Sequence, residues 1–378
     1  MKIAILTLPL HTNYGGILQA YALQTVLQRM GHEVEVLQNT SVSDHNPLLM
    51  PLVYGKRMAI KILKDWNATI FFERKKKRES PIIRQHTDRF IGNYLNLRNI
   101  KSLKEISPSD YDAFIVGSDQ IWRKPYFCYS WHTPMKDAFL DFAKGWDVKR
   151  IAYAASFGMD NINEYSQSDI EDCKEAIGMF DAVSVREDSG VNICKTKFGI
   201  EAIHVLDPTM LLCKEDYEKL VEESKVPNSP GDMLCYVLDP TELKNKVIEK
   251  ISLEKELTPF NVFAEVDNIN LPLEKRVQPP LEAWLRGFMD AKFVVTDSFH
   301  ACVFSIIFGK PFLVIGNSAR GMSRLTSLLS TIGLQNNLIK SEEDFKKIDF
   351  KEVSGINPKI LNNNQNSSLQ FLYSNIQK

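Results

Sequence analysis

Short apolar runs, which predict buried strands, alternate along this chain with longer amphipathic segments, which predict helices. This alternation is typical of α/β proteins, whose parallel sheets are covered by helices. The predicted strands cover residues 2–8, 33–37, 113–116, 151–157, 182–186, 204–206, 234–238, 260–264, 293–295 and 311–315, and the predicted helices cover 17–30, 241–257, 281–289 and 299–308.

The alternation is interrupted at residues 223–232, where prolines, serine and glycine predict a linker. We therefore expect an N-terminal Rossmann-like domain at 1–222, a C-terminal Rossmann-like domain at 233–345 and a tail at 346–378. Two such doubly wound domains predict a cleft between them, lined by the carboxyl ends of strands and the first turns of helices.

Three segments lack a clear periodicity. Residues 40–105 and the aromatic-rich stretch 123–147 are predicted to be irregular. In the tail, the asparagine-rich residues 362–368 predict a polar break before a short last helix at 369–376. We expect this helix to pack back on the N-terminal domain.

Composition narrows the class of protein. The chain has 378 residues, which is enough for two domains of ordinary size, and its net charge of −1 does not favour nucleic acid as a partner. The 6 cysteines have no zinc-ligand spacing and suggest no disulfide framework. No apolar run approaches the ~20 residues of a membrane span, and residues 2–8 predict a first strand rather than a signal peptide. We expect a cytoplasmic protein.

His300 is the only imidazole in an otherwise apolar βαβ segment at residues 293–315. It lies in the first turn of the predicted helix, at the carboxyl end of a strand, where open parallel sheets bind their ligands. The polar run 296–298 suits a turn, and Ser298 suits the N-cap of that helix. A catalytic or anion-binding histidine is one interpretation, and a hydrogen-bonded core histidine is the other.

Small polar residues follow two other predicted strands. In the first loop, two glycines at a helix start allow a ligand to approach the backbone N–H groups, and nearby side chains add hydrogen bonds. After the strand 113–116, short polar side chains are suited to holding sugar hydroxyls, although a local turn explains them equally well. The candidates are His11, Asn13, Gly15, Gly16, Ser118, Asp119 and Gln120.

Three arginines follow strands in the same way. Arg186 ends the strand 182–186, with Ser189 near the next helix start, and Arg320 and Arg324 follow the strand 311–315. A guanidinium binds phosphate or carboxylate in a forked geometry, so these residues are candidates for an anion site. Structural ion pairs and a solvated arginine pair are the alternatives.

The basic run at residues 74–78 is compatible with contact to anionic lipid, although such runs are more often solvated helix faces. The chain has no acid pair spaced for glycoside hydrolysis, no nucleophile elbow and no P-loop. The remaining chemistry is transfer from an anionic donor to a hydroxyl, with His300 as general acid and base.

Taken together, these motifs resemble the polysaccharide pyruvyl transferase family. The matching segments occur in the family's order and span most of the chain. They are residues 12–24, 117–122, 153–158, 184–189, 206–209, 296–301 and 320–325.

The resemblance implies a two-domain fold like that of the GT-B glycosyltransferases, with the acceptor on the N-terminal side and the donor on the C-terminal side. It implies transfer of pyruvate from phosphoenolpyruvate, as a co-substrate and without a further cofactor or metal. The acceptor would be a sugar of a bacterial cell-surface polysaccharide or of its lipid-linked precursor, and the product would be a ketal. Peripheral contact with the inner face of the membrane is a further expectation.

The resemblance also implies roles for individual residues. His300 maps to the family's histidine, and Arg186 maps to its arginine after the strand 182–186. Ser298 stands where members with ketal chemistry carry an arginine, two residues before the histidine, so one donor contact differs here. The expected donor-binding residues are Arg186, Ser189, Ser298, Arg320 and Arg324, and the expected acceptor-binding residues are Asn13, Tyr14, Gly15, Gly16, Ser118, Asp119 and Gln120.

Two other functions are compatible with the same motifs. A glycosyltransferase that uses a nucleotide-sugar donor would share the architecture. A non-catalytic protein that binds carbohydrate or anions would keep the fold and lose the chemistry.

Overall fold

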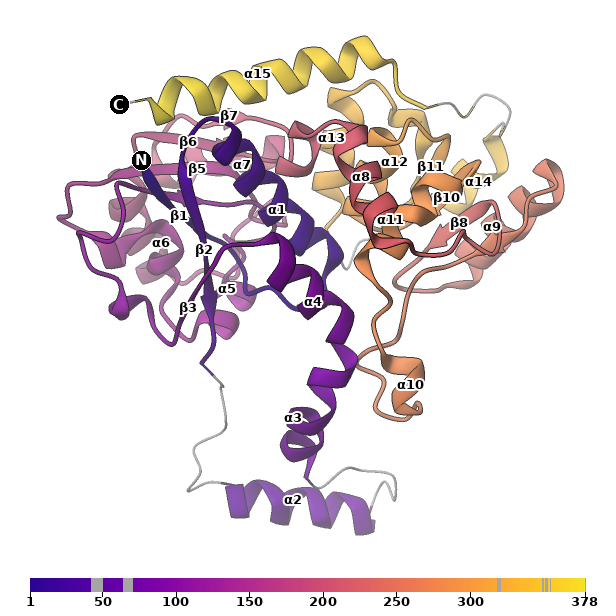
Figure 1. Cartoon of the computed structure of the whole chain (residues 1–378), viewed down its shortest axis with the longest axis horizontal. Helices are drawn as coiled ribbons and strands as arrows, with labels where there is room; N and C mark the ends of the chain where they lie inside the picture. Colours follow the sequence, from indigo (N-terminus) through magenta and orange to yellow (C-terminus); the bar gives the residue numbers. More distant parts are fainter. Residues whose placement is uncertain are drawn as a thin grey trace.

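A computed structural model describes residues 1–41, 50–63, 71–317, 321–348, 350, 353 and 355–377. Within these residues the chain forms two parallel sheets that lie side by side, with helices on their faces (Figure 1). The strand order of each sheet and the parallel pairing confirm the expected α/β class with two Rossmann-like, GT-B-like halves.

The first sheet has the order β3-β2-β1-β4-β5-β6-β7, which is the doubly wound order. β1 lies at its centre and pairs in parallel with β2 and β4. The bounds of its strands are β1 Lys2–Leu6, β2 Glu33–Asn39, β3 Leu97–Ile100, β4 Ala113–Val116, β5 Lys149–Ala155, β6 Ala182–Val185 and β7 Ile203–His204.

The second sheet has the order β12-β11-β10-β8-β9. Its central strand β10 is buried at every position, as its apolar sequence predicts. The bounds of its strands are β8 Met233–Tyr236, β9 Pro259–Phe260, β10 Phe293–Thr296, β11 Phe312–Ile315 and β12 Leu338–Ile339.

Helices connect these strands and cover both sheets (Figure 1). In the first half they are α1 Tyr14–Arg29, α2 Met50–Leu63, α3 Phe72–Ile83, α4 Gln85–Tyr94, α5 Lys124–Trp131, α6 Gln167–Ile177, α7 Asp188–Ile193 and α8 Lys214–Ser224. In the second half they are α9 Glu242–Lys255, α10 Leu273–Arg276, α11 Leu281–Asp290, α12 Phe299–Ile307, α13 Met322–Thr331, α14 Glu342–Lys347 and α15 Pro358–Ile376.

Two segments that were predicted to be irregular contain regular structure. Residues 40–105 include α2, α3, α4 and the edge strand β3, and residues 123–147 include α5. Local periodicity missed them because α2 and α3 are exposed along most of their described length and because α5 is short. Their side chains therefore show no simple alternation of buried and exposed positions.

The tail differs most from its prediction. The asparagine-rich residues 362–368 are not a break, because α15 runs through them from Pro358 to Ile376. Proline at the first turn and the Asn357 cap favour the helix start. Ser368 accepts a hydrogen bond from the Leu206 backbone N–H, and Phe371 packs on Tyr153 of β5. Tertiary contacts with the first sheet thus stabilise a helix that its polar sequence alone does not predict.

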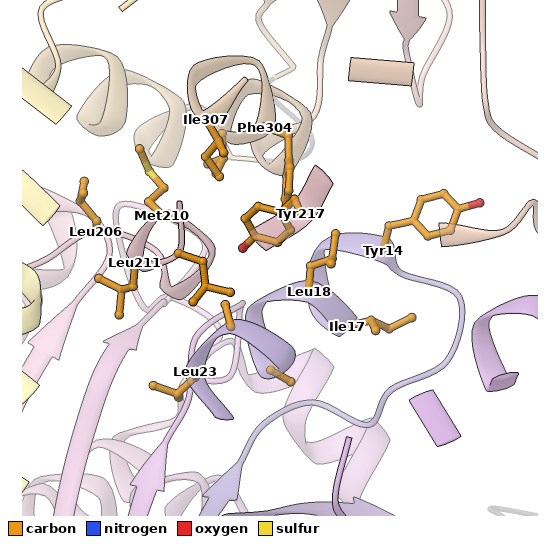
Figure 2. Packing of buried hydrophobic residues seen from close by; sticks show 14 of the residues in the cluster. Tyr14, Ile17, Leu18, Leu23, Leu206, Met210, Leu211, Tyr217, Phe304 and Ile307 are labelled. Carbon is orange, nitrogen blue, oxygen red and sulfur yellow. The ribbon is translucent and has the colours of Figure 1, made fainter. Parts of the chain in front are cut away.

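One hydrophobic cluster joins the two halves of the molecule (Figure 2). Its contact point is Tyr217 of α8, whose ring lies 4.9 Å from that of Phe304 in α12. The Tyr217 hydroxyl donates to the Thr209 carbonyl, so its polar end is satisfied inside the core. Ile17 and Leu18 of α1 belong to the same cluster. The halves are therefore held together by buried apolar surface as well as by the chain.

The division of the chain at 222 and 233 remains a prediction. Among the described residues, no helix is both long enough and apolar enough to cross a membrane.

Candidate functional site

The candidate site is assembled from loops that follow five strands of the two sheets. Asn13, Asp119 and Arg186 follow β1, β4 and β6 of the first sheet. His300 follows β10, and Arg324 follows β11 of the second sheet. The carboxyl ends of parallel strands meet at one edge of a sheet, so residues that are far apart in the sequence come together there.

Asp207 is the centre of the hydrogen-bond network. Its Oδ2 accepts from Arg186 at 2.7 Å and from the Ser118 hydroxyl at 3.1 Å. The same oxygen lies 3.7 Å from Nε2 of His300, within ion-pair distance but beyond a hydrogen bond. Oδ1 accepts from the backbone and hydroxyl of Thr209. One buried carboxylate therefore links residues from both halves of the protein.

The charge of Asp207 is maintained by its neighbours. Burial by itself raises the pKa of this carboxyl, but the His300 imidazole, the Arg186 guanidinium and the Thr209 hydroxyl outweigh burial and hold the pKa far below its usual range. Sequence reasoning included residues 206–209 in a motif but gave Asp207 no role. The sequence does contain a sign of this role, namely an aspartate directly after a short predicted strand. A turn before Pro208 explains the same aspartate equally well.

His300 lies against the start of α1. A Cβ atom on Gly15 would lie 2.0 Å from its Nδ1, so a glycine is required for the ring to occupy this position. The side chain is 7% exposed, and its Nε2 is buried with no hydrogen-bond partner among the described residues. An imidazole next to a buried carboxylate, with one nitrogen unsatisfied, can accept or release a proton for a bound ligand.

Two arginines approach the ring of Phe299. The guanidinium carbon of Arg186 lies 4.4 Å from the ring centroid, and that of Arg324 lies 5.5 Å from it. Burial, and then the charge of Arg186, lower the pKa of Arg324 to about 10. Nε and one terminal nitrogen of Arg186 are buried without a hydrogen-bond partner in the described structure, although the terminal nitrogen lies 3.8 Å from Asp119. Arg186 therefore has buried donor groups that no described residue uses.

His300, Phe299 and Arg324 line a cavity of about 100 Å³, whereas Asp207 and Arg186 are not part of its lining. Its lining comes from both halves, and Nδ2 of Asn13 donates to Asp119 at its wall. The lining residues are Asn13, Asp119, Gln120, Tyr126, Leu238, Asp297, Ser298, Phe299, His300, Asn317, Gly321, Arg324 and Leu325.

The structure brings together most of the residues singled out from the sequence. Gly15 lies against the His300 ring, and Gly16 lies against the Asn13 side chain, so both glycines adjoin residues that line the cavity. Tyr14 is not brought there, because its hydroxyl donates to the Pro279 carbonyl and its ring packs on Trp284. Ser189 lies on α7 outside the cavity lining. Arg320 lies outside the described residues.

Ser298 occupies the predicted N-cap position of α12, but its side chain makes no cap hydrogen bond. Its backbone N–H donates instead to the Thr296 hydroxyl, and Ser298 lines the cavity. Asp297 next to it has a structural role, since it accepts from two backbone N–H groups and pairs with Lys244 at 2.7 Å. The turn is thus organised by Thr296 and Asp297, which leaves the Ser298 side chain at the cavity.

A larger cavity of about 290 Å³ lies on the other side of the first loop. It is lined by His11 and Thr12, by α3 and the start of α4, and by the segment around α10. It shares no residue with the cavity at His300. The smaller cavity is the candidate site, because His300, with its unpartnered Nε2, lines it and lies 3.7 Å from the buried carboxylate of Asp207.

Comparison with known proteins gives one sequence family. Residues 13–319 match the family model described as polysaccharide pyruvyl transferase. These residues include every cavity-lining residue except Gly321, Arg324 and Leu325. No curated protein sequence matches the chain significantly.

Similar solved structures include a UDP-GlcNAc 2-epimerase from Neisseria meningitidis, with 12% identity and a TM-score of 0.48 over 99% of this chain and 100% of that one. They also include UGT89C1 from Arabidopsis thaliana, with 11% identity and a TM-score of 0.47 over 99% of this chain and 96% of that one. The first was solved with UDP-GlcNAc and the second with UDP-L-rhamnose.

Proposed function

This chain belongs to the polysaccharide pyruvyl transferase family, and on that premise we propose that it transfers pyruvate from phosphoenolpyruvate to a sugar as a ketal. The acceptor is a sugar of a cell-surface polysaccharide or of its lipid-linked precursor. The observation that carries the proposal is the cavity lined by His300, whose Nε2 has no hydrogen-bond partner in the described structure and lies 3.7 Å from buried Asp207, the partner of Arg186. Such a site is suited to a small anion and to one proton transfer.

The reaction balances with the groups available. Two sugar hydroxyls add to the enol carbon of phosphoenolpyruvate, and its methylene group takes up one proton to become a methyl group. The bond between the enol carbon and the phosphate oxygen breaks. The second hydroxyl proton leaves with inorganic phosphate. His300 passes a proton between the attacking hydroxyl and the methylene carbon. Asp207 lies 3.7 Å from Nε2 of His300 and holds the orientation of the ring, so it acts as a positioning residue.

The donor is held by positive charge and by the start of α12. Arg186 and Arg324 bind the phosphate and carboxylate, and the first N–H groups of α12 add hydrogen bonds. Ser298 contributes one hydroxyl from the cavity wall. We keep Ser189 and Arg320 as further donor-side candidates.

The acceptor is held by the first half. Asn13, Asp119 and Gln120 line the cavity and can bond sugar hydroxyls. Gly15 and Gly16 act on the acceptor side by leaving room for the side chains of His300 and Asn13. Ser118 supports the site by donating to Asp207. Tyr14 contributes by anchoring α1 to the Pro279 carbonyl. We place the reaction in the cytoplasm, where the proposed donor is produced.

The test measures donor binding and turnover separately. Phosphoenolpyruvate should raise the thermal unfolding midpoint of the protein, whereas UDP should not. With a panel of glycosides that carry neighbouring free hydroxyls, the protein should release phosphate from phosphoenolpyruvate. His300→Ala should lower that rate roughly 100-fold or more, and His86→Ala on α4 should leave it unchanged.

Three results would overturn the proposal. Stabilisation by UDP and not by phosphoenolpyruvate would indicate a glycosyltransferase with a nucleotide-sugar donor. Wild-type phosphate release by His300→Ala would remove the catalytic role of the histidine. Binding of glycosides without turnover of any donor would indicate a carbohydrate-binding protein.

A further inference from the structure

One face of α3 is fixed to the rest of the molecule. Lys75 donates to the Ile269 carbonyl at 3.2 Å, and Glu79 pairs with Arg276 of α10 at 2.7 Å. Lys75 and Glu79 are four residues apart and share one side of the helix. The other basic residues of the run, Arg74, Lys76, Lys77 and Arg78, are all exposed. Lys76 also lines the larger cavity, and Arg78 lies 3.6 Å from Glu79.

α2 projects beyond this anchored helix and lies apart from both sheets (Figure 1). Large apolar side chains are exposed there: Leu52 is 71% exposed, Met58 49% and Phe71 48%. Lys56 lies between them and is exposed as well. The ring of Phe71 lies 4.9 Å from that of Tyr54, which fixes the start of α3 against α2. Apolar and basic groups are thus presented together at one end of the molecule.

We propose that this end of the protein docks on an anionic lipid bilayer. The docking surface consists of Leu52, Lys56, Met58, Phe71, Arg74, Lys76, Lys77 and Arg78. Exposed apolar side chains enter the boundary between headgroups and acyl chains, and lysines and arginines beside them are attracted to anionic headgroups. The whole chain has a net charge of −1, so the positive charge is a property of this surface and not of the protein at large.

Charge complementarity favours a membrane over a second copy of this chain. In a symmetric dimer the same surface meets itself, so the basic run would face another basic run. A bilayer that contains anionic lipid presents the opposite charge.

The docking surface and the larger cavity both include residues of α3. α3 contributes Lys75, Lys76 and Glu79 to that cavity, and the first loop separates the cavity from the one at His300. If the acceptor is lipid-linked, which rests on the proposed function, docking through α2 and α3 would bring its sugar toward the first loop. The docking itself does not depend on the donor or on turnover.

The experiment measures co-sedimentation with vesicles. The full chain should bind vesicles of phosphatidylcholine mixed with phosphatidylglycerol and should bind phosphatidylcholine alone at least tenfold more weakly. Raising the salt concentration should weaken binding, because it screens the headgroup charge. Equal binding to both vesicles, or binding to neither, would overturn the proposal.

Variants locate the surface. Lys76→Gln together with Lys77→Gln should weaken binding to the anionic vesicles about 30-fold, since each cation near the surface contributes a several-fold factor. Leu52→Glu together with Met58→Glu should weaken it tenfold or more. The matched control is Leu253→Glu with Lys359→Gln, which changes a 72% exposed leucine on α9 and an exposed lysine on α15. The control should bind like the wild type, with all thermal midpoints alike.

Two further measurements separate this proposal from the proposed function. His300→Ala should bind anionic vesicles like the wild type, and the docking variants should turn over a soluble acceptor at the wild-type rate. Equal vesicle binding by the docking variants and the wild type would overturn the proposal. So would a concentration-dependent dimer that Leu52→Glu abolishes in a protein that does not bind vesicles.

Discussion

One oxygen atom of Asp207 lies close to Arg186, Ser118 and His300. The four residues come from four separate loops of the chain. Asp207 is 1% exposed, so an unpaired charge there would be costly. Arg186 and His300 offset that cost, and in return Asp207 holds both side chains in place. A single residue therefore contributes both to stability and to the geometry of the candidate site.

We expect Asp207→Asn to destabilise the protein in a way that depends on pH. The substitution leaves Arg186 without its buried partner, which costs roughly 3–5 kcal/mol near neutral pH. The folded-state pKa of Asp207 lies below the unfolded value of about 3.9, so its charge stabilises the fold above that pH. This stabilisation is lost as the pH falls below about 4 toward the folded-state pKa. Urea unfolding of the wild type and of Asp207→Asn between pH 7 and pH 3 measures this loss of stabilisation.

The difference in unfolding free energy between wild type and Asp207→Asn should shrink in acid. Asp147→Asn, at an exposed carboxylate, is the control and should show little difference at any pH. A difference for Asp207→Asn that stays constant from pH 7 to pH 3 would contradict the depressed pKa.

Single residues of the site differ in how well the sequence predicted them. His300 was predictable because an imidazole in an apolar helix is unusual, and Arg186 because a guanidinium ends a buried strand. Asp207 was not predictable as a residue of the site, because an aspartate before a proline is common in turns. Its role follows from partners far away in the sequence, which local patterns do not contain.

At the scale of elements, the site is the meeting of two helix starts. The first turn of α1 carries Gly15, and the first turn of α12 carries His300. A side chain at position 15 would overlap the imidazole, since a Cβ there would lie 2.0 Å from Nδ1. The glycine is needed for a close approach between helices, and its φ is not positive.

Gly15→Ala should therefore lower activity without unfolding the protein. Displacing the imidazole by about 1 Å costs roughly 100-fold in kcat/KM. Alanine in a helix is also more favourable than glycine by about 1 kcal/mol, which offsets part of the local strain. Phosphate release and the thermal midpoint are the two measurements.

Gly92→Ala on α4 is the matched control, because a Cβ there meets nothing within 4 Å. It should keep full activity and unfold at the same or a slightly higher temperature. Wild-type activity in Gly15→Ala would show that the position of the ring is not constrained by α1.

β4 and α11 match their predicted bounds to within one residue, whereas α1 begins three residues before its predicted start. The missed tail helix has a different cause from the missed α2, α3 and α5. α15 is helical through its asparagines because Phe371, Leu372 and Ile376 are buried against the first half. Local propensity is weak compared with such tertiary burial.

At the scale of the whole molecule, one apolar cluster contains residues from both sheets, including Ile3 of β1, Tyr217 of α8 and Phe304 of α12. Opening the two halves would expose this surface to water, which is unfavourable. The relative position of His300 and Asp207 thus depends on packing as much as on their own contacts.

We expect the two halves to unfold together. Phe304→Ala should lower the free energy of unfolding by about 3–5 kcal/mol, because the phenylalanine is fully buried, and should keep a single transition. Urea unfolding followed by tryptophan fluorescence and by circular dichroism measures both properties. Leu253→Ala on the exposed face of α9 should change little. Two separate transitions in the wild-type protein would contradict a shared core.

By itself, the sequence determined the α/β class, the places of the main strands along the chain, the family and the histidine at the start of α12. These features follow from hydrophobic periodicity and from short motifs, which are local along the chain. Only the tertiary structure decided that Asp207 joins Arg186 to His300, that Ser298 faces the cavity without capping its helix, and that α2 projects with apolar side chains exposed. Those features depend on contacts between distant segments, and their energies exceed the local preferences that a sequence displays.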